Sequence, residues 1–122
     1  ELRAALRVYL HDWTLPNLIG GSSELRQSAT LAAATGVAEA LLQEHDDAIV
    51  LLPALPAGWP HGRVTGLRAR DGITVDLSWR SGALHEAVLT AETPVRVRVV
   101  VDERSYEHAL DPQLPWRLRR AP

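Results

Sequence analysis

The spacing of hydrophobic positions along this chain changes from that of helices to that of strands. Leu2, Leu6 and Leu10 recur four residues apart, which predicts a helix over residues 1–11. Ser22 or Ser23 can cap a second helix that continues to about His45. Its apolar stripe is formed by Leu31, Ala34, Ala38, Leu41 and Leu42. The first third of the chain is therefore predicted to be a helical hairpin.

Strand-like patterns follow this hairpin. Residues 48–52 are typical of a short buried strand, and residues 51–60 form a proline-rich segment. A regular alternation then places Ile73, Val75, Leu77 and Trp79 on one face of a strand. Asp71-Gly72 and Ser81-Gly82 flank this strand as two-residue hairpin signals.

The later strands are less regular. Apolar residues in Ala83–Thr90 fall out of phase, which predicts either a bulge or a strand buried on both faces. Residues 95–101 alternate valine with arginine, and residues 113–118 are interpreted as an edge strand. An antiparallel sheet with one apolar face must cover it with a second sheet or with helices. We therefore predict an α+β chain, with the helical hairpin over residues 1–47 and a small antiparallel β-sandwich over residues 48–122.

Composition narrows the classes of function. The net charge of −2 gives no electrostatic reason to bind nucleic acid, and no apolar run approaches the roughly 20 residues that span a bilayer. The absence of cysteine excludes disulfides and thiolate chemistry, but it fits a cytoplasmic or an extracellular location equally. The five histidines lack close ligand spacing, so no metal site built from protein ligands is predicted. His45-Asp46-Asp47 could contribute to a calcium site, but a solvated helix end is the favoured interpretation.

Four phrases follow one another along the chain: Gly36–His45, Leu51–Pro56 with Trp59, Gly66–Arg70 and Val75–Trp79. Together they resemble the end of glycoside hydrolase family 95. Members of that family are mostly α-L-fucosidases, and some act on α-L-galactosides. The resemblance implies a catalytic barrel of paired helices closed by a small β-domain. Residues 1–47 would then be the last barrel helices, and we expect the chain to be a fragment of a longer polypeptide that acts on carbohydrate.

The resemblance also bears on catalysis. The family inverts configuration, which requires a carboxylic acid and a separate base with room for water between them. Its phrase Gln-Ile-Asp-Gly-Asn-Phe-Gly contains an aspartate of the base machinery, and an ungapped alignment places Ser28 there and Thr30 at the asparagine. A serine hydroxyl cannot act as that base without a partner base of its own. Glu24 lies four residues earlier on the same helix face and is the alternative base.

Trp13, Asn17 and Thr30 are the substrate-binding candidates, because the resemblance places them beside the sugar pocket. Trp59 and Trp79 are expected to pack in the interior rather than to stack on sugar rings. The leading hypothesis is the C-terminal portion of an α-L-fucosidase-like hydrolase, in which this part is mainly structural and inactive alone. The alternatives are a catalytically inactive glycan-binding relative and a purely structural or interaction module.

Overall fold

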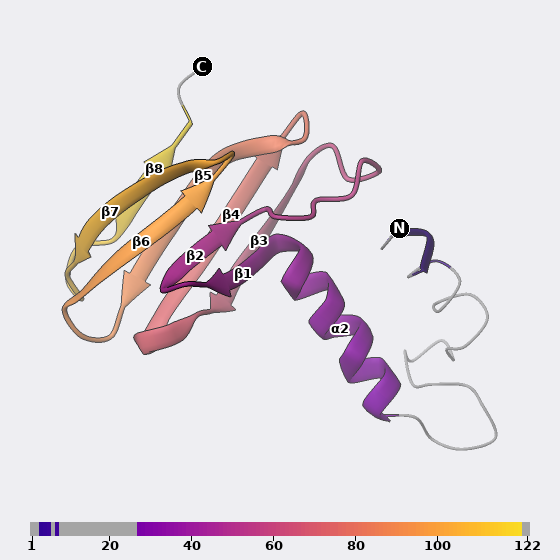
Figure 1. Cartoon of the computed structure of the whole chain (residues 1–122), viewed down its shortest axis with the longest axis horizontal. Helices are drawn as coiled ribbons and strands as arrows, with labels where there is room; N and C mark the ends of the chain where they lie inside the picture. Colours follow the sequence, from indigo (N-terminus) through magenta and orange to yellow (C-terminus); the bar gives the residue numbers. More distant parts are fainter. Residues whose placement is uncertain (1–2, 6, 8–26, 121–122) are drawn as a thin grey trace.

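A computed structural model describes residues 3–5, 7 and 27–120 of the chain, and Figure 1 shows helix α2 leading into a β-sandwich. Residues 3–5 and 7 are helical, and α2 spans Gln27–Leu41. Eight strands follow within the described residues: β1 Leu42–His45, β2 Ala48–Leu51, β3 Gly62–Arg68, β4 Ile73–Arg80, β5 Ala83–Ala91, β6 Val95–Val101, β7 Arg104–Leu110 and β8 Trp116–Arg119.

The strands form two four-stranded sheets. One has the order β1-β2-β6-β7 and the other β3-β4-β5-β8. Neighbouring strands are antiparallel except β2 and β6, which are parallel. The mostly β, two-sheet architecture fits the predicted sandwich. The predicted helical hairpin stays a prediction, because most of its first helix lies outside the described residues.

The second helix is shorter than predicted. It ends at Leu41, so the expectation that it continues to about His45 is wrong. Residues 42–45 instead form β1, which pairs with β2 through a tight turn at Asp46-Asp47, where both residues have positive φ (48° and 62°). Leu41 and Leu42, where the helix gives way to the strand, suit a buried helix end and a buried strand start equally. The hydrophobic periodicity alone therefore does not locate the boundary between helix and strand. The division into domains at residue 47 stays a prediction, but the sheet itself begins at Leu42.

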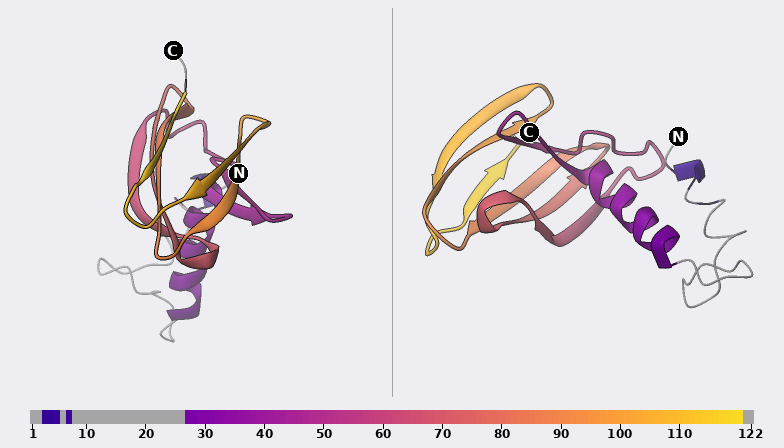
Figure 2. Two further views of the ribbon diagram at one scale, coloured as in Figure 1. Left: turned by 90° about the vertical axis from the view of Figure 1, so that its left-hand side faces the viewer. Right: turned by 60° about the horizontal axis from the view of Figure 1, so that its bottom comes forward.

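The core lies between the inner faces of the two sheets. The four apolar residues predicted to share one face of β4 are all buried, at 0–6% exposure. They form one buried cluster with Ile49 and Leu51 of β2 and with the alternate valines of β6, Val97, Val99 and Val101. Figure 2 shows these two layers from the end and from below.

Two bulges keep the irregular strands in phase with this core. In β5, the register to β4 shifts between Glu86 and Leu84, so that Leu84 joins Ala87 and Leu89 on the buried side. This confirms the bulge that the out-of-phase residues predict. In β3, the register shifts between Val64 and Leu67, and Gly66 lies inside the shift with φ of +77°. An extra residue on one strand is the usual way to restore inward alternation.

The two predicted glycine turns are confirmed, because Asp71-Gly72 and Ser81-Gly82 both have positive φ at both residues. The predicted edge strand near the C-terminus corresponds to β8. Strand β7 has no counterpart in the sequence-based prediction. A stacked pair, His108 of β7 and Trp116 of β8, joins the two sheets at this edge, with ring centroids 4.5 Å apart.

Candidate functional site

Most of the residues predicted to serve catalysis and substrate binding lie outside the residues that the structure describes. Trp13, Asn17 and Glu24 lie outside the described residues. Ser28 and Thr30 lie near the start of α2, where the backbone is described and the side chains are not. Their proposed roles therefore remain predictions, and the described site is the junction that fixes the other end of α2.

This junction contains no loop, because β1 begins one residue after α2 ends. The last carbonyls of a helix lack partners within the helix and need other donors. Here the backbone N–H of Leu52 donates to the Leu41 carbonyl at 2.8 Å, and that of Ala54 donates to the Ala40 carbonyl at 3.2 Å. Ala40 and Leu41 are also buried. The segment after β2 therefore caps the helix and sets its direction relative to the sheet.

The capping segment is itself fixed to the second sheet. The indole Nε1 of Trp79 donates to the Trp59 carbonyl at 3.0 Å, and Trp79 is only 6% exposed. The backbone N–H of Gly82 donates to the Pro60 carbonyl at 2.8 Å. This confirms the expected packing role of Trp79. The proline-rich segment thus connects the end of α2 to strand β4.

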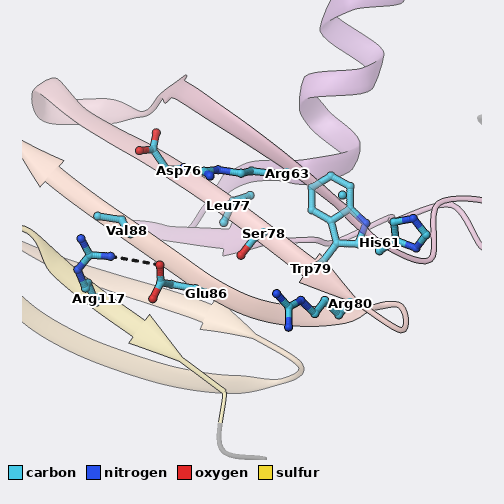
Figure 3. A pocket seen from close by; sticks show the side chains of 11 residues that line it. His61, Arg63, Asp76, Leu77, Ser78, Trp79, Arg80, Glu86, Val88 and Arg117 are labelled. Carbon is cyan, nitrogen blue, oxygen red and sulfur yellow. Dashed lines mark hydrogen bonds and ion pairs between the residues drawn. The ribbon is translucent and has the colours of Figure 1, made fainter.

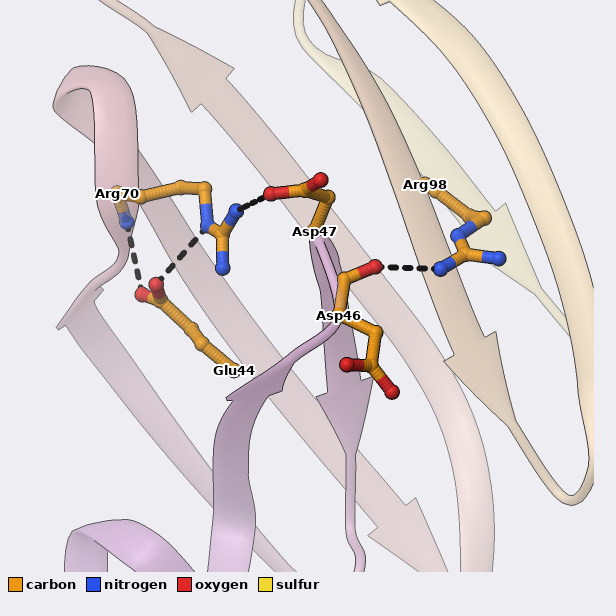
Figure 4. Close-up of polar contacts among 5 residues, drawn as sticks. All are labelled: Glu44, Asp46, Asp47, Arg70 and Arg98. Atoms are coloured by element: carbon orange, nitrogen blue, oxygen red, sulfur yellow. Dashed lines mark hydrogen bonds and ion pairs between the residues drawn. The ribbon is translucent and has the colours of Figure 1, made fainter.

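A cluster of charged residues makes a second connection between the sheets (Figure 4). Arg70, in the turn between β3 and β4, donates from its backbone N–H and its Nε to the two carboxylate oxygens of Glu44, at 2.8 and 3.1 Å. Its Nη1 donates to Asp47 Oδ1 at 2.8 Å. The pKa of Arg70 is raised, most strongly by its hydrogen bond to Glu44 and next by its hydrogen bond to Asp47. Arg98 of β6 donates to the Asp46 carbonyl at 2.6 Å, so the β1–β2 hairpin is held from both sides.

The outer face of the β3-β4-β5-β8 sheet carries a shallow groove of about 580 Å³, here called the outer groove (Figure 3). Two carboxylates lie in it. Glu86 accepts from Arg117 at 3.2 Å and also from Arg119, and the hydrogen bond from Arg119 holds the pKa of Glu86 below its usual value. Asp76 Oδ1 accepts from the backbone N–H of Gly66 at 2.8 Å.

Neither carboxylate is arranged as the acid of a glycosidase. A general acid in such an enzyme has a raised pKa, whereas that of Glu86 is lowered. Asp76 is instead engaged in a hydrogen bond from the backbone amide of Gly66. Within residues 27–120 and the helical residues near the start, no group of three or more potential metal ligands occurs. In the same part of the chain, no helix is long and apolar enough to cross a membrane.

The described residues therefore form a β-sandwich joined directly to one helix, and the groove carboxylates Glu86 and Asp76 make contacts within the sheet. The family model of the glycoside hydrolase family 95 C-terminal domain matches residues 43–113. The chain therefore belongs to glycoside hydrolase family 95. The match begins one residue after the start of β1, which agrees with a sheet that starts at Leu42.

Two curated relatives agree with this assignment. The chain is 42% identical to Alpha-L-fucosidase 2 of Arabidopsis thaliana over 85 residues. This aligned region covers 69% of this chain and 10% of that protein. It is 44% identical over 52 residues to Probable alpha-fucosidase A of Aspergillus oryzae (strain ATCC 42149 / RIB 40), covering 43% of this chain and 7% of that protein. The matched region is thus a tenth or less of either relative's length.

Proposed function

We propose that this chain is the C-terminal portion of an inverting, α-L-fucosidase-like hydrolase that acts on terminal fucosyl or related glycosides. Support comes from the family match and from the names of the two relatives. In this proposal, residues 1–47 supply the last helices of a helical barrel. The sandwich holds them in place and has no catalytic chemistry of its own, and no cofactor is required.

The observation that carries the structural role is the junction at the end of α2. The helix is buried at Ala40 and Leu41, whereas Ala34, two turns earlier, is exposed. Figures 1 and 2 show α2 extending away from both sheets. Among the described residues, α2 is anchored to the sandwich at its C-terminal end, and its apolar residues further from the sheets would pack against other helices. The upstream helices of the longer enzyme are the partner that this proposal assigns to that surface.

Turnover of a chromogenic α-L-fucoside tests this assignment of roles. The full-length parent enzyme is expected to release the chromophore, and the 122-residue chain alone is expected to release none. The same assay on the parent enzyme with Arg70→Ala tests the charged cluster separately from the predicted catalytic residues. Arg70 lies far along the chain from Ser28. Turnover by the isolated chain would refute a purely structural role.

Ser28 favours a second candidate, a catalytically inactive relative that binds glycan. The resemblance expects an aspartate at this position, and a lone serine is not a general base at neutral pH. The discriminating variant is Ser28→Asp in the parent enzyme, compared with Ser28→Asn as an uncharged control of similar size. Glycan binding without turnover by the unaltered parent, and gain of turnover in the aspartate variant only, would support this candidate. Rapid turnover by the unaltered parent would exclude it.

A further inference from the structure

We propose that the outer groove binds an acidic saccharide, and that Arg63 and Arg80 hold its carboxylate group. This inference rests on the proposed function, because it assumes that the parent enzyme meets glycans. It extends that function by assigning a binding surface and a substrate class to the sandwich. The groove lies on the face of the sheet that points away from the core (Figure 3).

The register of the sheet brings these two arginines together. Arg63 on β3 is the direct partner of Ser78 on β4, and Arg80 lies two residues further along the same face. Directly opposed residues in an antiparallel pair have Cβ atoms about 5 Å apart, and alternate residues on one strand are about 7 Å apart. Two long guanidinium side chains at these spacings can reach one anion above the Ser78 hydroxyl.

Arg117 is already paired with Glu86, whereas Asp76 accepts only the neutral Gly66 amide and keeps its negative charge beside Arg63 (Figure 3). Arg63 and Arg80 are exposed, and neither side chain makes a hydrogen bond or an ion pair with another of the described residues. They are the two groove arginines without an ion pair within the described part of the chain.

The side-chain chemistry favours a carboxylate. All 13 basic residues of the chain other than histidine are arginines. The planar guanidinium group binds carboxylate through two parallel hydrogen bonds, whereas lysine offers only a point charge. The hydrogen-bonded sheet fixes the spacing of the two arginine backbones, so only their side chains must be ordered on binding.

The rest of the lining favours a saccharide over a bare anion. His61 and Ser78 offer further hydrogen-bonding groups, and Val88 adds a small apolar surface beside them. A volume of about 580 Å³ lies within the range of small-molecule sites and exceeds what a single inorganic anion fills. An acidic sugar ring combines the required negative charge with several hydroxyl groups. A chain of two or three such sugars would lie along the strands.

Calorimetric titration of the 122-residue chain tests the proposal with trigalacturonate as the acidic probe. The uncharged probe of the same length is β-1,4-galactotriose, and sodium sulfate is the inorganic anion. Trigalacturonate is expected to bind at least tenfold more tightly than either, and its affinity should fall as salt is raised. Equal binding of the neutral trisaccharide, or displacement of trigalacturonate by equimolar sulfate, would overturn the proposal.

Paired variants separate the groove from the overall charge. Arg63→Gln with Arg80→Gln removes two charges from the groove and is expected to weaken trigalacturonate binding at least tenfold. Arg96→Gln with Arg104→Gln removes two charges from the other sheet, on β6 and β7, and should leave binding unchanged. Equal losses in the two double variants would show a net-charge effect and overturn the site. Fucosidase activity does not enter this readout, so failure of the proposed function and failure of the groove are distinguishable.

Discussion

Replacing Gly62 by alanine tests whether the junction depends on a close contact between β3 and Trp79. A Cβ atom added at Gly62 would lie 2.3 Å from Cζ2 of Trp79 and 2.8 Å from its Cε2. An ordinary contact needs at least 3.4 Å, so the ring would have to move by about 1 Å. The ring is 6% exposed and its Nε1 is bound to the Trp59 carbonyl, so it has little room to move.

The expected cost follows from these contacts. Forcing one extra carbon into a packed core costs about 1–3 kcal/mol. If the displaced ring loses its hydrogen bond to Trp59, about 0.5–1.5 kcal/mol is added. Each 1 kcal/mol lowers the melting temperature of a domain of this size by roughly 4–8 °C. Gly62→Ala should therefore unfold measurably earlier in urea and on heating.

A double-mutant cycle assigns this loss to the contact with Trp79. Trp79→Phe shortens the ring, so Gly62→Ala should cost less in the Trp79→Phe background than in the unaltered chain. Gly66→Ala is the matched control, because Gly66 has no atoms within 4 Å of its added Cβ and carries only the strain of its φ of +77°. Its cost should be the same in both backgrounds. Additive effects of Gly62→Ala and Trp79→Phe would refute the reasoning.

Three further predictions concern the core, the helix cap and the acid limit of stability. In urea titrations, Leu77→Ala should lower the free energy of unfolding by about 2–5 kcal/mol, because Leu77 is only 1% exposed. Leu114 is 69% exposed, so Leu114→Ala should change the free energy of unfolding by less than about 0.5 kcal/mol. Ala54→Pro removes an N–H that caps α2 and should speed amide hydrogen exchange in the last helical turn without changing that of β4. Arg119 lowers the pKa of Glu86 in the folded state. The stability that ionised Glu86 contributes is therefore fully present above its ordinary pKa of 4.5, and it is lost as the pH falls through the folded-state pKa. Glu86→Gln should flatten the fall of the urea midpoint below pH 4.5, and an equally steep fall in the variant would contradict this account.

The parts of the fold that sequence predicts well are those with a strong local signal. Strand β4 alternates buried residues with less buried ones along its whole length, and glycine marks the turns on both sides. Strand β6 has the same alternation of valine and arginine over most of its length. The bulge in β5 was also predictable, because a break in phase within an apolar strand has few other physical causes.

The missed elements have turns without glycine. Asp46-Asp47 and Asp102-Glu103 occupy positive φ at both turn positions, as the two glycine turns do. Aspartate tolerates this conformation, but its presence near a helix pattern indicates a helix end just as well. Strand β7 was further concealed because its partly buried positions are Tyr106 and His108, which carry polar groups and weaken the apolar alternation. Its pairing with β6 and the stacking of His108 on Trp116 decide its structure.

The described sites were not predictable from local sequence at all. Arg70 and Glu44 are separated by 26 residues, and Arg119 and Glu86 by 33. Arg63 and Arg80 become neighbours only through the register of β3 on β4. No periodicity relates such pairs, because the fold of the whole sandwich brings them together. The predicted catalytic residues, by contrast, came from a resemblance to a family, and they stay predictions.

The direction of α2 matters more to the position of Ser28 than to the sandwich itself. Ser28 lies 13 residues before Leu41, which corresponds to about 20 Å of helix at 1.5 Å per residue. A tilt of about 5° at the junction would therefore displace Ser28 by roughly 1.7 Å. A displacement of about 1 Å can reduce an enzymatic rate by about 100-fold. In the proposed parent enzyme, Ala54→Pro should consequently lower kcat for a chromogenic α-L-fucoside strongly. The melting temperature of the sandwich should change little. An unchanged kcat would mean that the upstream helices alone orient α2.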